Sequence, residues 1–226
     1  MANKNVELTS MIIQRRILGT LCGLLAPCSL LFGLIGWKHN LPEWYMSISS
    51  TYYANSKMFM IGLLCATSIF FFAYKGYDWR DRVCSLVQAI AAIGIVIFPC
   101  ATPGIPERVG LFCLTVHTSN IIHCIMAATL FLAFDFNILF LFTLGNGEPT
   151  ERKKLRNKIY YICGGIIFVF MVLQGFHSQV SKILPAWFPL TWFNEFMMLE
   201  PFAFAYIVKS SAIGRFNDIT ISSTKI

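Results

Sequence analysis

Seven residues of the 226-residue sequence combine a reactive side chain with a strongly apolar neighbourhood. Carboxylates and imidazoles of this kind carry protons at catalytic and transport sites, and both are zinc ligands. Because an ionised group in hydrocarbon is costly, such residues usually face a protein interior or a wet cavity. The seven are Asp135, Glu195, Glu200, His39, His117, His123 and His177.

Helical geometry tests which of these side chains can meet. At about 100° per residue, His117 and Asp135 share one helix face, with Asn120 near it, whereas His123 points about 120° away from His117. Zinc ligands on one helix are normally three or four residues apart, so this spacing argues against a clasp made by two histidines. A metal site made by His117, His123, His177 and Glu195 would then need the helix that carries the first two to bend, or to present ligands on both of its sides.

The two glutamates near the C-terminus also point in different directions. Glu195 and Glu200 are about 140° apart on a regular helix, although Pro201 can reorient the turn between them. We expect Glu195 to face the interior, in line with Phe202 and Tyr206.

The composition identifies the elements that must position these residues. The chain is 56% hydrophobic and only 13% charged, against about 45–50% and about 25% in soluble domains. This excludes an ordinary soluble domain and a disordered chain. Six apolar blocks approach the roughly 20 residues that a membrane helix needs. We therefore predict an all-α bundle of six transmembrane helices forming a single domain over 1–226, with spans at 17–37, 58–74, 83–101, 117–144, 159–176 and 191–208.

The basic residues predict the orientation of this bundle. Most of the 18 lysines and arginines fall in the N-terminal segment, the second and fourth loops and the C-terminal tail. Basic loops stay on the cytoplasmic side, so we expect both termini there, in contact with anionic lipids. The net charge of +7 then needs no nucleic-acid partner. All four histidines fall on the outer side in this topology.

Two cysteines of the predicted outer side have alternative interpretations. Cys100 and Cys113 flank a proline-rich loop and can form a disulfide if that side is oxidising, or else remain packed thiols.

The segment 43–53 also has two interpretations. Its polar and apolar residues alternate enough for it to cover the end of the bundle, either as a functional lid or as an interfacial anchor.

Several short motifs are similar to those of a known group. They are Ser47-Ile48-Ser49-Ser50-Thr51-Tyr52-Tyr53, Tyr74-Lys75-Gly76-Tyr77-Asp78 with Asp81, His123 followed by Ala127 and Ala128, and Glu195 with Val208-Lys209. Together they resemble a family of uncharacterised bacterial six-span membrane proteins, itself loosely similar to the DRAM-like and other multispan proteins of unknown function. The resemblance implies the six-helix fold and singles out Glu195 and His123, but implies no activity. A resemblance to ceramidase-like membrane hydrolases fails, because a third histidine has no convincing position.

These observations lead to one preferred function and two alternatives. The preferred function is binding or transport of a small or lipid-like ligand, with proton coupling as a further expectation, by Glu195, His123, His117, Asn120, Asp135 and Glu200. The first alternative is a lipid-headgroup hydrolase with zinc, and the second is a membrane subunit without chemistry. The sequence has no nucleotide or haem motif, and we expect no cofactor for the preferred function. We favour a non-enzymatic role because the histidine spacing in 117–144 does not fit a metal site. The lack of an Asn-x-Ser/Thr sequon favours a bacterial inner membrane.

Overall fold

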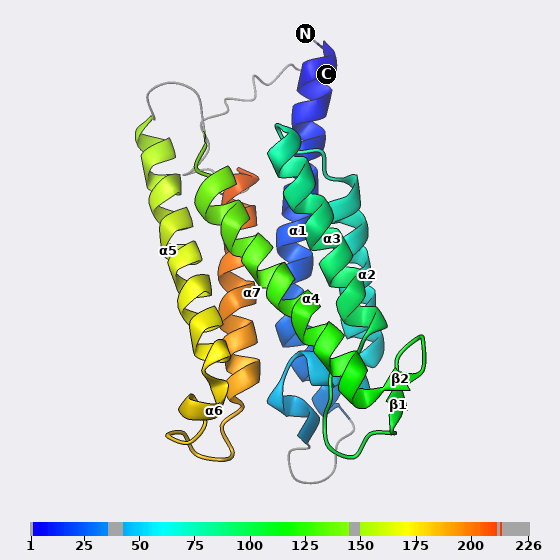
Figure 1. Ribbon diagram of the computed structural model, residues 1–226. Helices are drawn as coiled ribbons and strands as arrows, with labels where there is room; N and C mark the ends of the chain where they lie inside the picture. The colour runs from blue at the N-terminus through cyan, green and yellow to red at the C-terminus, as the bar shows by residue number, and fades with distance from the viewer. Residues whose placement is uncertain (1, 36–42, 145–149, 212, 214–226) are drawn as a thin grey trace.

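The computed structural model describes residues 2–35, 43–144, 150–211 and 213. In this part of the chain the architecture is helical, apart from one short ladder (Figure 1). The six long helices are α1 (Ala2–Leu34), α2 (Lys57–Ala73), α3 (Trp79–Ile97), α4 (Val116–Phe136), α5 (Glu151–Gly175) and α7 (Leu190–Lys209).

Short elements fill the connections between these helices. Two 3-10 turns, η1 (Glu43–Met46) and η2 (Ser49–Tyr53), follow α1, and the π-turn η3 (Asn137–Leu141) continues α4. The strands β1 (Arg108–Val109) and β2 (Leu114–Thr115) pair antiparallel between α3 and α4, and α6 (His177–Val180) follows α5.

The helix boundaries follow capping residues more closely than the edges of the apolar blocks. Asp78, Thr115 and Thr150 each accept a backbone N–H in the first turn of α3, α4 and α5. As a result α3 starts at Trp79 and α5 at Glu151, earlier than the predicted spans, because polar turns extend helices beyond their apolar part. Three helical segments are long and apolar enough to cross a membrane, namely Leu8–Leu34, Val116–Leu141 and Glu151–Gly175.

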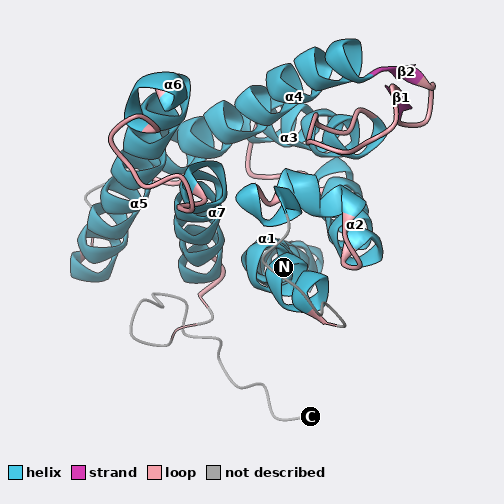
Figure 2. Cartoon of the chain, turned by 90° about the horizontal axis from the view of Figure 1, so that it is seen from below, coloured by secondary structure: helices cyan, strands magenta, loops and turns pink. Residues whose placement is uncertain are grey.

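The helices form a chain of neighbours in the order α5, α7, α1, α2, α3, α4 (Figure 2). Helix α4 crosses the bundle obliquely in Figure 1, so its end approaches α5 while its start lies over α3. The core contains buried side chains from all six long helices, with the rings of Phe71, Phe134, Phe202 and Tyr206 at its centre.

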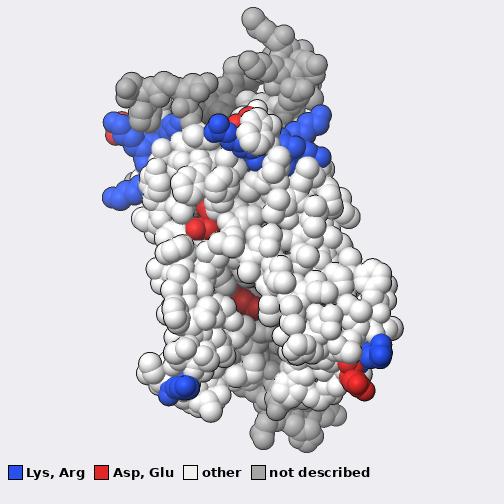
Figure 3. All heavy atoms as spheres, in the orientation of Figure 1, with Lys and Arg blue, Asp and Glu red and all other residues white. Residues whose placement is uncertain are grey.

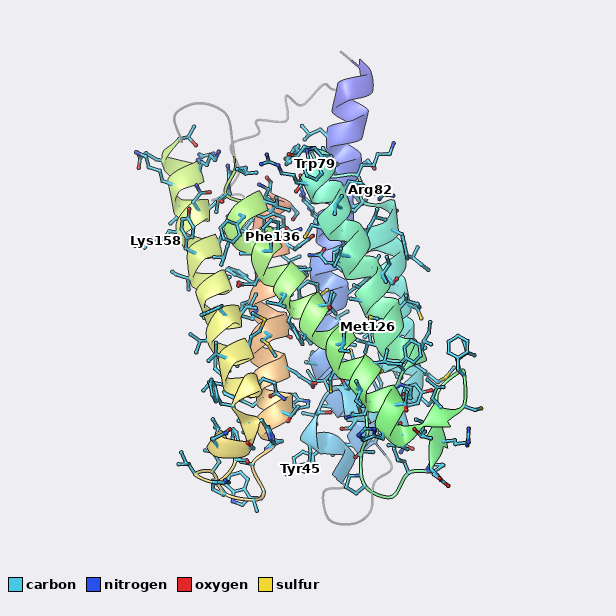
Figure 4. The ribbon with its side chains drawn as sticks, in the orientation of Figure 1. Tyr45, Trp79, Arg82, Met126, Phe136 and Lys158 are labelled. Carbon is cyan, nitrogen blue, oxygen red and sulfur yellow. The ribbon has the colours of Figure 1, made fainter. Side chains whose placement is uncertain are left out.

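Basic side chains gather at one end of the bundle. Figure 3 shows most of the visible lysine and arginine atoms at the end where α1 begins and α7 finishes. Figure 4 places Arg82 and Lys158 at this end, with Tyr45 at the opposite one. We call the two ends the basic end and the opposite end. The predicted basic loops therefore share one side of the molecule.

Small residues allow the closest helix contacts. A side chain at Gly19 of α1 would meet the Ala203 carbonyl oxygen and the Ile207 side chain of α7, both at 2.9 Å from its Cβ. At Gly164 of α5, a Cβ would lie 2.3 Å from Leu139. In hydrocarbon, helix association relies on such close packing.

We predict that Gly19→Val lowers the apparent unfolding temperature of the detergent-purified protein, because the branched side chain pushes α1 away from α7. Overpacking of this kind costs about 1–3 kcal/mol. Gly62→Val is the matched control, since no heavy atom lies within 4 Å of the Cβ position at Gly62. Equal unfolding temperatures for the two variants would contradict the observed α1–α7 contact.

Candidate functional site

A cavity of about 1000 Å³ lies between α4, α5, α7 and the segment around η1 and η2. It exists because α4 and α5 touch closely near Gly164, where Leu139 and Asp135 pack against α5, and separate toward the opposite end. Figure 3 shows this face hollowed between the two sides, with acidic atoms visible in the depth of the hollow. The bundle thus contains a space large enough for an organic ligand.

The walls of the cavity are mainly apolar. Phe131 and Leu132 come from α4, and Phe168, Met171 and Val172 come from α5. Its polar lining is confined to a few residues, of which Glu195 is the acid: Ser47, Ser49, Ser50, Thr102, Asn120, His123, Gln174, Thr191 and Glu195. A few polar groups in an apolar space are typical of ligand pockets.

Glu195 joins α7 to the segment that covers the opposite end. One carboxylate oxygen accepts the backbone N–H of Ile48 at 2.6 Å, and the other is 3.4 Å from the Ser49 hydroxyl. Ile48 is itself buried in the core. The segment 43–53 therefore does cover the bundle as a fixed part of the fold, and it places two donors on the carboxylate.

The start of α4 holds a second irregular segment, 98–101. The His123 ring nitrogen Nδ1 donates to the Phe98 carbonyl at 2.8 Å, and the Ser119 hydroxyl donates to the Pro99 carbonyl at the same distance. The Asn120 side chain accepts the Ala101 backbone N–H at 2.8 Å. His123 is only 4% exposed, so its first role is to satisfy a backbone group.

Tyr53 completes the support of this segment from η2. Its hydroxyl donates to the Cys100 carbonyl at 2.9 Å. Burial raises the pKa of the Tyr53 phenol above its ordinary value, because the charged phenolate is poorly solvated there. The hydroxyl therefore keeps its proton and remains a donor.

The structure separates the other predicted site residues from this cavity. His117 is exposed, His177 is partly buried at the start of α6, and neither is among the cavity-lining residues. Asp135 is buried against Gly164, with one oxygen lacking a partner among the described residues. Glu200 lies against Gly23 of α1. Only Glu195, His123 and Asn120 of the predicted set therefore meet at one cavity.

Metal ligation has little geometric basis in the described residues. Among them, no group of three or more His, Cys, Asp or Glu side chains is placed to hold an ion. His39 lies outside the described residues. Cys100 and Cys113 are both free, the first buried and the second exposed.

Sequence reasoning missed part of the polar lining. Gln174 of α5 accepts the side-chain N–H of Asn194 at 2.8 Å, and this pair joins α5 to α7 next to the cavity. Ser47 and Ser50 bind each other's backbone and also line the cavity. Uncharged polar residues in an apolar sequence carry no spacing signal of their own, although amides within predicted spans could have been flagged as helix contacts.

No protein family, curated protein or solved structure matches this chain.

We predict that His123→Leu destabilises the protein, because the Phe98 carbonyl would be buried without its donor. The loss of such a partner costs about 1–3 kcal/mol. His123→Asn keeps a donor on a short side chain and should retain most of the stability. Thermal unfolding in detergent distinguishes the variants. Equal destabilisation by His123→Asn and His123→Leu would show that the hydrogen bond to the Phe98 carbonyl does not account for the contribution of His123 to stability.

Proposed function

We propose that this chain is an integral membrane protein that binds a lipid-like amphipathic ligand in the cavity between α4, α5 and α7. The observation that carries the proposal is an apolar space of about 1000 Å³ with one carboxylate, Glu195, in its wall. Ligand pockets are typically about 300–1000 Å³ and use a few polar groups to orient a mostly apolar ligand.

The outer wall of the cavity is evidence that the ligand has an apolar tail. Leu132, Phe168 and Val172 line the cavity and are also 58%, 55% and 43% exposed at the surface of the bundle. In a bilayer this surface faces lipid chains. The cavity is thus continuous with the apolar phase, so a ligand can enter from the side and leave its tail between α4 and α5.

The carboxylate indicates the chemistry of the head group. When Glu195 is ionised it only accepts hydrogen bonds, at about four acceptor positions. Ile48 and Ser49 use two of them. The remaining positions favour a head group that donates, such as an ammonium or a hydroxyl group. An acid head group would repel the carboxylate.

The proposal includes the membrane topology. We infer six spans, both termini on the cytoplasmic side and a bacterial inner membrane, supported by the basic residues gathered at one end. The cavity then opens in the outer half of the bilayer. Proton-coupled transport would extend this function, with Glu195 as the proton carrier. Asp135 and Glu200 have separate helix contacts, at Gly164 and Gly23, so neither is assigned to the ligand.

The zinc hydrolase has weaker support. Two of its four proposed ligands, His117 and His177, are not among the residues that line the cavity. Binding without catalysis is therefore the function that the geometry favours.

We predict that green fluorescent protein, which is active in the cytoplasm, is fluorescent when fused after Lys209 or inserted at 150, and that alkaline phosphatase is inactive at both positions. At 104 we expect the reverse, because alkaline phosphatase is active only after export. Lys209 ends α7 and position 150 precedes α5, both at the basic end, whereas 104 lies between α3 and β1 at the opposite end (Figure 1). The same compartment for all three positions would contradict the topology.

We predict that a fluorescent long-chain amine binds the detergent-purified protein more tightly than the carboxylic acid of equal chain length. Ala128 lines the cavity, so Ala128→Trp should fill it and weaken binding by about tenfold or more. Ile125→Trp is the matched control, because Ile125 is 56% exposed on the same helix and is not among the cavity residues. Fluorescence titration measures both affinities.

Glu195→Gln tests the head-group contact within the same assay. The amide keeps an acceptor for the Ile48 N–H but loses the charge, so the preference for the amine over the acid should disappear. For the cavity-filling variant described above, unchanged affinity of a folded Ala128→Trp protein would show that the amine binds outside this cavity.

A further inference from the structure

A second polar region lies at the basic end and is separate from the cavity. Its central residue is Arg15 of α1, which is only 2% exposed. The sequence places Arg15 beside Arg16 as a charged flank of the first span, and Arg16 is indeed exposed. The fold instead turns Arg15 inward.

Arg15 has tyrosine partners where a carboxylate would be expected. Its Nε donates to the Tyr74 hydroxyl at 2.9 Å, and its Nη1 donates to the Tyr77 hydroxyl at 3.1 Å. The remaining guanidinium nitrogen, Nη2, is buried and has no partner among the described residues. A buried cation without a counter-charge is costly.

Lys209 at the end of α7 adds a second basic group, and burial together with the charge of Arg15 lowers the pKa of its amine to about 7. Its amine donates to the Phe142 carbonyl at 2.8 Å. It also lies 5.7 Å from the ring centre of Tyr77 and 5.8 Å from that of Tyr160. Two basic groups therefore share the aromatic side chain of Tyr77.

The tyrosines around these basic groups have hydroxyl hydrogens to donate. Tyr74 and Tyr77 use their oxygens to accept from Arg15, and neither O–H group donates a hydrogen bond within the described part of the chain. The hydroxyls of Tyr160 and Tyr206 are buried and lack partners in the described part of the chain. Both rings pack against Phe142, whose carbonyl binds Lys209, with ring centres 5.5 and 4.9 Å from that of Phe142. We call Arg15, Tyr74, Tyr77, Tyr160, Tyr206 and Lys209 the Arg15 cluster.

Acceptors near the cluster are few. Asp81 is the nearby acid, and one of its oxygens accepts the Tyr77 backbone N–H at 2.8 Å. The Phe142 carbonyl accepts from Lys209. Among the described residues, the donors of the cluster therefore outnumber these acceptors, and Arg15 forms no salt bridge with a carboxylate. A ligand that complements it must carry several acceptors, negative charge and no need for donors.

We propose that the Arg15 cluster binds an oxyanion of the phosphate class. Phosphate oxygens accept several hydrogen bonds at once, and a guanidinium can bind them through two parallel N–H groups. Tyrosine hydroxyls supply the remaining donors. Water would satisfy the donors but would leave the positive charge without compensation.

The position of the cluster gives the anion access. Tyr77 is 61% exposed and follows α2 at the basic end. Arg15 and the other three tyrosines are at most 2% exposed, so a phosphate from solution or from a lipid head group would reach the cluster past Tyr77. None of the cluster residues lines the cavity, so this site does not depend on the proposed ligand-binding function.

The test measures stabilisation of the full chain purified in a maltoside detergent, which contains no phosphate. Inorganic phosphate is compared with chloride at equal ionic strength, and phosphatidic acid is compared with diacylglycerol. A ligand that binds only the folded state raises the unfolding temperature with its concentration. Stabilisation by inorganic phosphate identifies a free oxyanion, and stabilisation by phosphatidic acid alone identifies a lipid head group. Both results support the site, whereas no stabilisation by either probe overturns it.

Three variants assign the effect to the cluster. Arg15→Gln should weaken the apparent affinity for the effective probe by about tenfold or more, as expected for the loss of a charge-assisted contact. The control Arg16→Gln removes a neighbouring exposed charge and should leave the affinity unchanged. Equal losses in both variants would show a general charge effect and overturn the proposal.

Tyr206→Phe keeps the test decisive if Arg15→Gln does not fold. Its hydroxyl has no partner among the described residues, so its removal should not destabilise the ligand-free protein. Removal should lower the stabilisation that the probe produces. If Tyr206→Phe lowers the unfolding temperature without the probe, and the probe still raises it as much as in the wild type, then the Tyr206 hydroxyl contributes to stability alone and does not bind the anion.

Discussion

Backbone N–H and C=O groups of non-helical segments need hydrogen-bond partners when they are buried in an apolar protein. This requirement explains the side-chain contacts at the opposite end of the bundle. The segment 98–101 has no helical partners for its carbonyls, so His123 and Ser119 of α4 donate to them. Ile48 likewise donates its N–H to Glu195 of α7. Side chains with reactive chemistry, such as His123 and Glu195, therefore also form hydrogen bonds to the backbone of non-helical segments.

This double use explains where the cavity is found. Irregular segments cover the opposite end of the bundle, and the polar residues that hold them line the space beneath. The oblique path of α4 then determines its width, because α4 reaches α5 closely at Gly164 and leaves it elsewhere. A ligand site arises between a fixed polar cover and apolar helix walls.

The two polar regions of the molecule differ in sign. The cavity contains a carboxylate whose partners are neutral donors. The Arg15 cluster contains two basic side chains surrounded by tyrosines. The two regions lie at different ends of the bundle and share no residue.

The helical elements and their apolar character can be predicted from local sequence alone. The six apolar blocks each correspond to a long helix, because hydrocarbon-like composition and helix caps are local properties. The capping residues Asp78 and Thr150 could also have been recognised, since each precedes a helix with the usual side chain. Six spans and the positions of the termini relative to a membrane remain predictions.

Only the tertiary structure decided which polar residues meet. Glu195, His123 and Asn120 share a cavity, while His117 and Asp135 do not join them, although helical spacing places the last two on one face. Because α4 crosses the bundle obliquely, its two ends face different neighbours. The inward position of Arg15 was likewise not predictable, since it depends on tyrosines 59 and 62 residues away in the chain. Contacts between distant segments are set by packing, and packing has no signature in local composition.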